Sequence, residues 1–492
     1  MKKSGLLLIF ILPLVVKSQS DYWQQRVNYF IEVTLNDTEH SLEAFEKLEY
    51  INHSPDTLNF IWFHVWLNAY KNDRTAFSEQ RLSHNRTDFY FSEKEDRGYI
   101  NRLDFKVNGI TTRVENHPVH IDIIKVLLPA PLQPGHTITI TTPFHVKLPK
   151  VFSRGGHVSQ SYQLTQWYPK PAVYDRKGWH ALPYLDQGEF YSEFGDYDVR
   201  ITLPGNYVVA ATGKLQDEHE IQWLKEATNA NRLSQQQPAI TTEPAIKKVT
   251  KPNDFPASSP RTKTLHYLQK DVHDFAWFAD KRFLINHDTL TLASGKVVQI
   301  QSFYLPSSTG NWKSSTRFMK DVIRTRSEWI GEYPYQTMSA VETETGLRGG
   351  MEYPAITNIS KPRSEDELSR AISHEVTHNW FYGILASNER LHPWMDEGMT
   401  TYYDSRYREA KKFTSTVFMQ NFAPLFLSKR IPDNIQGLAF ETIAGIKKDQ
   451  PINTSSEKFN GLNYSLITYH QGGDWMKKLE TFLGRPMFDS CM

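Results

Sequence analysis

Cysteine is nearly absent from this sequence of 492 residues, and the single example is Cys491. One cysteine cannot form a disulfide within the chain, so a disulfide-stapled fold is excluded and stability has to come from packing. No cysteine lies near the N-terminal apolar segment, which argues against a lipid-anchored lipoprotein. Hydrophobic residues make up 39% of the chain and aromatic residues 13%, which is enough for sizeable cores.

An excess of charge of one sign is also missing. Lysine and arginine together number 56 against 55 for aspartate and glutamate, and no long basic run interrupts the chain. Nucleic-acid-binding surfaces have a clear basic excess, so we do not expect nucleic acid as a partner. The sequence also lacks a glycine-rich phosphate-binding loop and an internal repeat of fixed period.

Long apolar runs are confined to the N-terminus, where MKK precedes GLLLIFILPLVV at positions 5–16. This run is too short to cross a bilayer, and Val16 and Ser18 fit the small-residue positions of a signal-peptidase site. We therefore predict a signal peptide over residues 1–18, cleaved near Ser18. The protein is then exported, periplasmic or extracellular, with no membrane span in its mature part. A short membrane anchor is the alternative.

The pattern of apolar and polar residues changes twice along the rest of the chain. Residues 19–215 alternate apolar and polar positions with a period of two, as in HTITIT at 136–141, which predicts an N-terminal β domain. Residues 216–262 are poor in aromatics and rich in Ser, Gln, Pro and Thr, which predicts a low-complexity insertion or loop. Residues 263–492 show mainly helical spacing with some strand. The predicted fold class is therefore α+β.

The stretch AISHEVTHNWFYG, residues 371–383, has two histidines four positions apart. Ser364 followed by Glu367 is a capping box, so a helix should begin at Glu365 and continue through the motif, with Gly383 as its C-cap. The remaining question is whether this helix binds zinc or is an ordinary amphipathic helix.

On such a helix His374 and His378 lie on one face, about 6 Å apart along the axis, and could share one zinc ion. Glu375 points in a neighbouring direction and could accept a proton from water at the metal. A catalytic zinc needs a third protein ligand, and Glu397 follows in a second helix whose first turn suits Pro393. This third position favours the metal site over two unrelated histidines.

A second cluster, GLRGGMEYP at 346–354, lies shortly before the zinc helix. Its paired glycines, Gly349 and Gly350, let the backbone approach a substrate closely. Glu352, next to Met351, could hold a free α-amino group through a charge-assisted hydrogen bond. A turn with a solvated glutamate is the alternative.

These motifs together resemble the aminopeptidase N family of zinc metallopeptidases, and the likeness extends over nearly the whole mature chain, especially to a bacterial branch. The family's His-Glu-x-x-His, eighteen residues, then Glu is matched by the residues above, with Trp380 two positions after the second histidine. Its exopeptidase motif Gly-x-Met-Glu-Asn is matched at Gly349, Met351 and Glu352, except that Tyr353 replaces the asparagine.

The resemblance implies a saddle-like β domain followed by a thermolysin-like catalytic domain that binds one zinc ion through His374, His378 and Glu397. It implies Glu375 as the general base and Glu352 as the anchor of the substrate's N-terminus. The chain ends at Met492 inside an expected helix, where family members continue, so we expect an incomplete catalytic domain.

The same resemblance implies two further site residues. Tyr469, in LITYHQGG, would hydrogen-bond the oxyanion, with Tyr464 as the second choice and a packed core tyrosine as the alternative; Gln471 stands where the family has lysine. Gln166, in LTQWYPKPAVYD, would help to bind the amine.

The sequence thus predicts a secreted zinc aminopeptidase whose partners are peptides with a free N-terminus. Two alternatives stay open. A thermolysin-like endopeptidase shares the zinc spacing but needs no amine anchor. A catalytically silent peptide-binding scaffold would keep the fold without turnover, although such proteins usually lose a ligand or the base.

Overall fold

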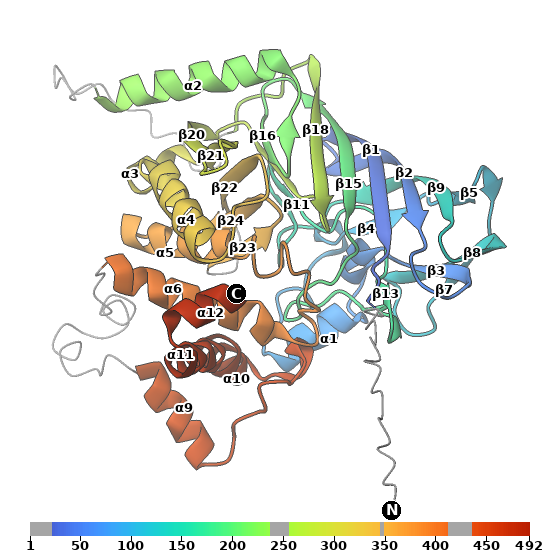
Figure 1. The fold of residues 1–492 in the computed structure, drawn as a ribbon. Coiled ribbons are helices and arrows are strands. Elements are labelled where there is room, and N and C mark those ends of the chain that lie inside the picture. Colours follow the sequence, from blue (N-terminus) through green and yellow to red (C-terminus); the bar gives the residue numbers. More distant parts are fainter. Residues whose placement is uncertain (1–21, 237–254, 345–348, 412–434) are drawn as a thin grey trace, which may run out of the picture.

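The computed structural model describes residues 22–236, 255–344, 349–411 and 435–492. The predicted signal peptide lies outside these residues. A β-rich N-terminal part, blue to green in Figure 1, lies beside a C-terminal part, yellow to red. The C-terminal part begins with both strands and helices and continues with helices. Within the described ranges, no helix combines the length and apolar character that a membrane crossing requires.

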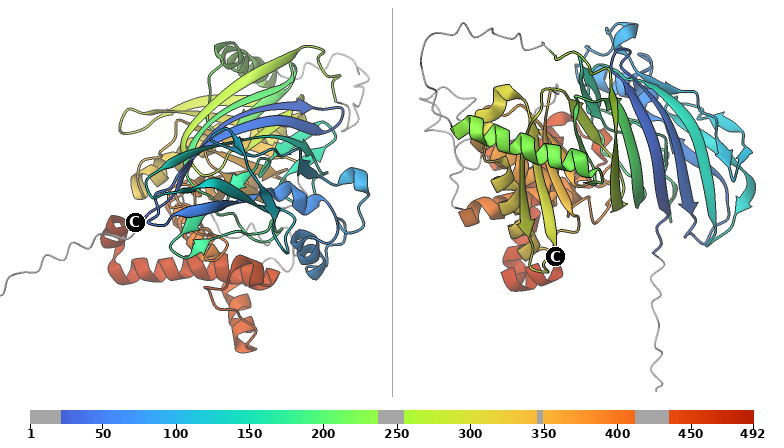
Figure 2. Two further views of the ribbon diagram at one scale, coloured as in Figure 1. Left: turned by 90° about the vertical axis from the view of Figure 1, so that its right-hand side faces the viewer. Right: turned by 90° about the horizontal axis from the view of Figure 1, so that it is seen from above.

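The N-terminal part is built on a nine-stranded sheet with the order β17-β18-β15-β1-β2-β9-β5-β6, in which β4 also pairs with β9. Figure 2 shows its long strands side by side in one curved layer. On β1 every second side chain is buried, from Val27 to Leu35, as expected for a strand with one face on the core. The strands are β1 (Arg26–Asn36), β2 (Ser41–Ile51), β4 (Tyr99–Asn101), β5 (Lys106–Val107), β6 (Ile110–Thr111), β9 (Thr137–Lys147), β15 (Gly195–Pro204), β17 (Lys214–Leu215) and β18 (Thr262–Val272).

Smaller sheets complete this part. One has the order β12-β3-β8-β7, a second has the order β10-β11-β19-β16, and β13 pairs with β14. Their strands are β3 (Leu58–His64), β7 (Val114–Asn116), β8 (Ile123–Leu132), β10 (Gly156–Val158), β11 (Ser161–Leu164), β12 (Lys170–Pro171), β13 (Tyr174–Asp175), β14 (Gly178–Trp179), β16 (Val208–Ala211) and β19 (Trp277–Asp280). The helical pieces are α1 (Ala76–Ser83), η1 (Trp66–Tyr70) and η2 (Lys94–Asp96).

The predicted domain boundary at residue 263 is wrong. Strand β18 pairs with β15 and β17, and β19 pairs with β11 and β16, so the β domain continues to Asp280. The predicted loop at 216–262 contains a helix, α2 (Glu218–Gln236), whose Leu224 is buried. Composition could not reveal either feature, because strand pairing joins residues far apart in sequence and a polar helix anchored by few side chains resembles a loop.

The C-terminal part combines a five-stranded mixed sheet, of order β20-β21-β22-β24-β23, with helices. Its three central strands are parallel, and each edge strand is antiparallel to its neighbour. Strand β22 is buried along its whole length, as expected at the centre of a covered sheet. The strands are β20 (Leu284–Thr291), β21 (Val297–Tyr304), β22 (Thr337–Thr343), β23 (Gly350–Tyr353) and β24 (Ile356–Ser360).

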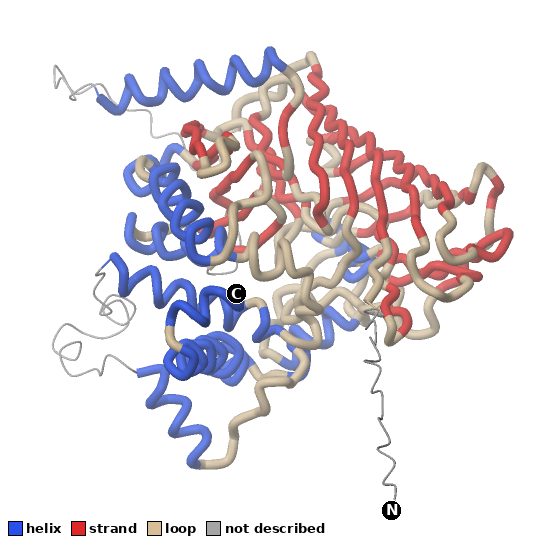
Figure 3. The backbone as a smooth tube through the Cα atoms, in the orientation of Figure 1, coloured by secondary structure: helices blue, strands red, loops and turns tan. Residues whose placement is uncertain are grey.

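Helices fill the rest of the C-terminal part, as the blue segments of Figure 3 show. Helix α4 contacts β20 and β21, and α5 contacts β23, β24 and α6. The helices are α3 (Thr309–Trp312), α4 (Ser315–Trp329), α5 (Glu365–Thr377), α6 (Glu397–Lys411), α9 (Ile435–Gly445), α10 (Gly461–Asn463), the π-helical segment η6 (Tyr464–Gln471), α11 (Gly472–Leu483) and α12 (Arg485–Cys491). Short 3-10 turns are η3 (Pro306–Ser308), η4 (Pro393–Met395) and η5 (Ser456–Lys458).

A buried carboxyl in the β domain gives a prediction about stability. Glu46 on β2 is 0% exposed, its oxygens contact no hydrogen-bond donor among the described residues, and burial raises its pKa well above the ordinary 4.5. Above pH 4.5 the unfolded chain releases this proton while the folded protein keeps it, so the free energy of unfolding falls by up to about 1.4 kcal/mol per pH unit. Glu46→Gln should therefore match the wild type at pH 4 and become progressively more stable than it as the pH rises.

The measurement is denaturant unfolding of both proteins between pH 4 and pH 8. Glu49→Gln, which changes an exposed carboxylate on the same strand, is the control and should show no such trend. A difference between Glu46→Gln and the wild type that does not vary with pH would contradict the prediction.

Candidate metal centre and amine site

Helix α5 carries the two motif histidines. Ser364 Oγ accepts a hydrogen bond from the Glu367 amide at 3.1 Å, as predicted, and Glu367 reaches back to the Arg363 amide at 2.8 Å. The helix ends at Thr377, so Gly383 is not its C-cap. A Cβ at Gly383 would lie 2.5 Å from the Asn379 carbonyl oxygen, and close packing of the following turns explains this glycine better than helix capping does.

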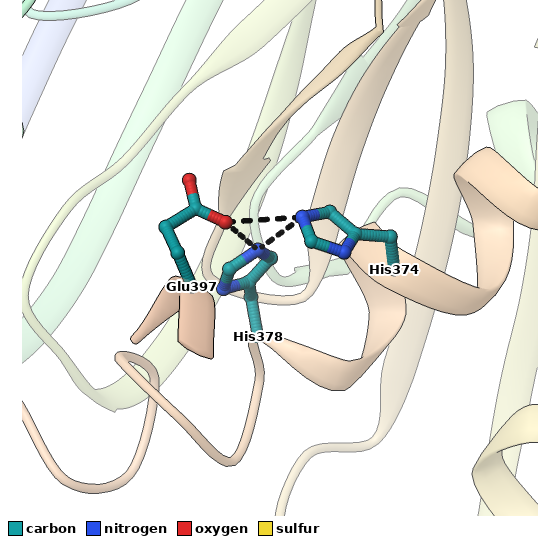
Figure 4. A group of neighbouring side chains, drawn as sticks. All are labelled: His374, His378 and Glu397. Carbon is teal, nitrogen blue, oxygen red and sulfur yellow. Dashed lines mark hydrogen bonds and ion pairs between the residues drawn. The ribbon is translucent and has the colours of Figure 1, made fainter. Parts of the chain in front are cut away.

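Three donor atoms converge at the predicted metal site, as Figure 4 shows. His374 Nε2 is 3.1 Å from Glu397 Oε2 and 3.2 Å from His378 Nε2, and His378 Nε2 is 3.4 Å from the same carboxylate oxygen. Donor atoms at about 2.05 Å from a tetrahedral zinc ion lie about 3.3 Å from each other, so this spacing fits zinc. Glu397 is the first residue of α6, directly after the turn that begins at Pro393.

Each histidine is oriented by a second carboxylate that sequence reasoning missed. His374 Nδ1 donates to Asp404 Oδ2 at 2.9 Å, and His378 Nδ1 donates to Asp396 Oδ1. Histidine ligands of zinc commonly donate their other ring nitrogen in this way, which fixes the ring and its tautomer. The positions of both aspartates in the sequence could have indicated this role, because Asp396 immediately precedes Glu397 and Asp404 lies two helical turns after it.

The charges of the cluster favour a cation. Burial lowers the pKa of His374 and His378, but the hydrogen bonds and charges of the neighbouring carboxylates outweigh burial and raise both pKa values well above 6.5. Burial raises the pKa of Glu397, but the two histidines outweigh it and lower the pKa below its ordinary value. The protons that these groups share are those that a divalent cation would displace on binding.

Glu375 faces the edge strand β23 across a glycine. A Cβ at Gly350 would lie 2.5 Å from Glu375 Oε1, so glycine at this position makes room for the carboxylate. Burial raises the pKa of Glu375 to about 7, and Oε2 has no hydrogen-bond partner within the described part of the chain. A buried carboxylate with a free oxygen beside the metal site is suited to transferring a proton.

Glu352, on β23, lies between the metal cluster and a second group of acids. One of its oxygens is within 4.8 Å of a donor atom of His378 and of Glu397, and it belongs to a separate group with Glu189 and Glu389 that has the same spacing. Arg154 compensates Glu189 through hydrogen bonds of 2.5 and 3.0 Å.

The other two acids of this second group lack such a partner. Glu389 is 0% exposed, and neither of its oxygens nor Oε1 of Glu352 contacts a hydrogen-bond donor among the described residues. Burial raises the pKa values of Glu352 and Glu389 well above 4.5. Uncompensated buried carboxylates of this kind favour a cationic ligand. No sequence motif pointed to Glu189 or Glu389, which lie in loops of different domains.

The residues around Glu352 have distinct surroundings. Gly349 adopts a φ of 111°, which only glycine takes up easily, where the chain enters β23. Met351 is buried with its side chain in the core, and Tyr353 is buried with its ring 6.4 Å from Phe278 of β19. The substitution of tyrosine for the family's asparagine therefore packs the edge strand against the β domain.

Gln166 is not in the group around Glu352. Its amide nitrogen donates to Asp274 at 2.5 Å, and its amide oxygen accepts from Lys170 at 2.6 Å. Both polar atoms are used within the β domain, so the structure gives no support to the predicted contact with a substrate amine. Glu189 is the β-domain residue that reaches Glu352 instead.

Tyr469 lies beside the metal cluster on the π-helical segment η6. Its hydroxyl donates to Glu397 Oε1 at 2.5 Å, and its ring stacks on His374 with the centroids 5.9 Å apart. Tyr464, the second choice, donates to Glu189 at 3.2 Å and so belongs to the acidic group. A Cβ at Gly472 would lie 2.8 Å from the Gly398 Cα, and this close approach of two glycines brings the segment against α6.

Comparison with known proteins agrees with this geometry. Residues 318–492 match the model of the Peptidase family M1 domain. Among solved structures, the M1 zinc metallopeptidase of Deinococcus radiodurans aligns with a TM-score of 0.56 and 15% identity, covering 95% of this chain and 84% of that one. A mutant of the same enzyme bound to a Tyr-Ser-Ala substrate aligns with a TM-score of 0.58 and 15% identity, covering 95% and 85%.

The curated relatives match a smaller share of this chain than the solved structures do. Leucine aminopeptidase 2 of Aspergillus fumigatus is 26% identical over 151 residues, which is 29% of this chain and 22% of the relative. Leucine aminopeptidase 2 of Candida glabrata is 24% identical over 181 residues, 34% of this chain and 26% of the relative. The match thus spans about a quarter or less of the length of these relatives.

Residues 318–492 of this chain are therefore similar to the Peptidase family M1 domain, and the predicted resemblance is confirmed. The predicted α+β fold, a β domain followed by a mainly helical catalytic domain, is confirmed by the two-domain structures. Zinc as the cofactor is confirmed by the family and by the donor set.

The second carboxylates give a prediction about metal affinity. Asp396→Asn keeps the shape of the side chain but removes the charge that holds the Nδ1 proton of His378, so zinc should bind about 10-fold to 100-fold more weakly. Chelator competition on the purified protein measures this affinity. Glu365→Gln, on the exposed first turn of α5, is the control. An unchanged zinc affinity in Asp396→Asn would contradict the orienting role.

Proposed function

We propose that this protein is a zinc aminopeptidase that removes the N-terminal residue of peptides. One observation carries the proposal: Glu352, whose Oε1 contacts no hydrogen-bond donor among the described residues, lies between the metal donors and a buried group of acids. A metal site alone would suit any metallopeptidase. A cluster of buried acids directly beside it favours a substrate that presents a cation next to the scissile bond, and a peptide N-terminus does so.

When bound, zinc supplies a Lewis acid that polarises the scissile carbonyl and lowers the pKa of water at the site. Glu375 accepts a proton from the attacking water and passes it to the leaving nitrogen, for which its unpartnered oxygen is available. Tyr469 presents its hydroxyl on the same side as Glu397 and can donate to the oxygen on which negative charge develops.

Recognition of the substrate amine rests on Glu352 and Glu389. Both are buried, both have an oxygen that lacks a donor among the described residues, and an α-ammonium group offers three N–H donors. Arg154 already neutralises Glu189, so this residue contributes less to binding the amine than Glu352 and Glu389 do. The Tyr-Ser-Ala peptide bound to the Deinococcus radiodurans relative is a substrate of the same chemical class.

Two alternatives are less well supported. A thermolysin-like endopeptidase needs no binding site for a free amine. Three carboxylates beside the metal donors would attract an ammonium group more strongly than an uncharged peptide backbone. A peptide-binding scaffold without turnover would not need Glu375, for which the backbone at Gly350 makes room.

We also propose that the protein acts outside the cytoplasm, periplasmic or extracellular. The support is the basic and then apolar N-terminal segment, residues 1–16, followed by small residues that fit signal-peptidase cleavage near Ser18. Sequencing the N-terminus of the protein recovered from the periplasm or medium tests this proposal. A cytoplasmic protein that retains Met1 would refute it.

Hydrolysis should depend on Glu375. Glu375→Gln removes the general base and should lower kcat by about 10²-fold to 10⁴-fold, with zinc still bound. The measurement is hydrolysis of aminoacyl fluorogenic amides together with the metal content of each variant, with and without a chelator. Glu365→Gln is the matched control on the same helix. If the change leaves peptide binding intact and the wild type also fails to hydrolyse any amide, the scaffold alternative is correct.

Cleavage should require a free amine. Glu352→Gln and Glu389→Gln should each lower kcat/KM on free aminoacyl amides by about 30-fold, which corresponds to the loss of about 2 kcal/mol from one charge-assisted hydrogen bond. N-acetylated substrates should be hydrolysed poorly by the wild type and no worse by the variants. Equal wild-type rates on acetylated and free substrates would favour the endopeptidase.

A further inference from the structure

A buried arginine on α4 connects the three helices behind the metal cluster. Arg326 has a fully buried side chain. Its Nε donates to Thr377 Oγ1 at 2.9 Å and its Nη2 donates to Ser373 Oγ at 3.2 Å, both on α5. The same Nη2 lies 3.3 Å from Asp404 Oδ1 on α6. The planar guanidinium, which is always charged, can make these contacts at the same time.

Asp404 transmits these contacts to the metal site. Its Oδ1 accepts from Ser373 Oγ at 2.7 Å and from Arg326, and its Oδ2 accepts from His374 Nδ1 at 2.9 Å. Two donors on Oδ1 fix the rotation of the carboxylate, and this rotation directs Oδ2 at the histidine. The orientation of His374 is thus set by a residue that does not touch it.

The surroundings show what Arg326 prevents. The Asp404 side chain is 19% exposed, and a cavity of about 100 Å³ lies beside it, lined in part by Arg370, Ser373 and Arg408. Without the guanidinium the carboxylate has room to turn towards this cavity and its two arginines, away from His374. The rings of Trp329 and Tyr407, with centroids 5.5 and 5.0 Å from the guanidinium carbon, hold Arg326 itself in place.

We propose that Arg326 is a positioning residue for the metal centre, which acts through Asp404 to hold His374 in the orientation that zinc requires. The inference rests on the zinc site of the proposed peptidase, but not on which bond the enzyme cleaves. It assigns a role to α4, for which the sequence predicts only helical spacing.

The test is a cycle of Arg326→Gln, Asp404→Asn and the double variant, made in the full chain, with zinc affinity measured by chelator competition. Each single change should weaken zinc binding about tenfold, the loss typical of partners behind a metal ligand. If Arg326 acts through Asp404, the double variant should bind zinc within about twofold of Asp404→Asn alone, because the two losses are then not independent. Losses that multiply, or an unchanged affinity in Arg326→Gln, would overturn the proposal.

Two controls separate positioning from general packing. Arg324→Gln changes an exposed arginine on the same helix and should leave zinc affinity unchanged. Thr377→Val removes the acceptor of Arg326 Nε but leaves the contact with Asp404, so the metal-free protein should melt at a lower temperature while zinc affinity stays within about twofold. A tenfold loss of zinc affinity in Thr377→Val would mean that helix packing is responsible, and would overturn the role of Asp404.

If Arg326→Gln does not fold, Arg326→Lys replaces it in the same cycle. Lysine keeps the charge but lacks the fork that reaches Asp404 and Thr377 together, so a smaller loss of about threefold is expected, again absent in the Asp404→Asn background. A lysine variant with wild-type affinity, or with a loss that persists in that background, would overturn the proposal. A wild type that binds zinc but cleaves no peptide would refute the aminopeptidase and leave this inference standing.

Discussion

Compensation of buried negative charge is the constraint on which this site depends. Carboxylates from both domains meet around His374 and His378, and an uncompensated carboxylate in such a place is costly. Protons shared with the two histidines compensate Glu397, and Arg154 compensates Glu189. Oε1 of Glu352 and both oxygens of Glu389 contact no hydrogen-bond donor among the described residues, and the positive charge that acts on Glu352 comes from His378, itself one of the metal donors. The arrangement therefore favours ligands that carry positive charge, in agreement with the proposed metal ion at one end and ammonium group at the other.

Close backbone approaches make this concentration of acids possible. Gly350 leaves space for the Glu375 carboxylate, and Gly398 against Gly472 brings η6 to the start of α6. Because of that second contact, the Tyr469 hydroxyl reaches Glu397, although more than seventy positions separate the two residues in the sequence. Glu189 of the β domain approaches Glu352 from the other side. The proposed site thus belongs to the junction between domains and to neither domain alone.

Motifs that depend on local geometry were readable from the sequence. His374 and His378 lie one turn apart on any helix, and Ser364 starts that helix, as predicted. Glu397 is the first residue of the next helix, whereas the sequence predicted a start at Pro393, which lies in a separate 3-10 turn. The helix end was misplaced because Gly383 serves close packing and not a cap. The resemblance implies Gln166 at the amine site, but its amide is used by Asp274 and Lys170, which no local pattern could show.

The sequence by itself determined the class of fold and the candidate metal ligands, because helical periodicity fixes which side chains share a face and zinc chemistry fixes which side chains can bind it. Tertiary structure alone decided where the β domain ends, since strands β18 and β19 find partners far along the chain. It also decided which acids surround Glu352 and which carboxylates orient the histidines. Those groups come from separate loops and helices, and only folding sets the distances between them.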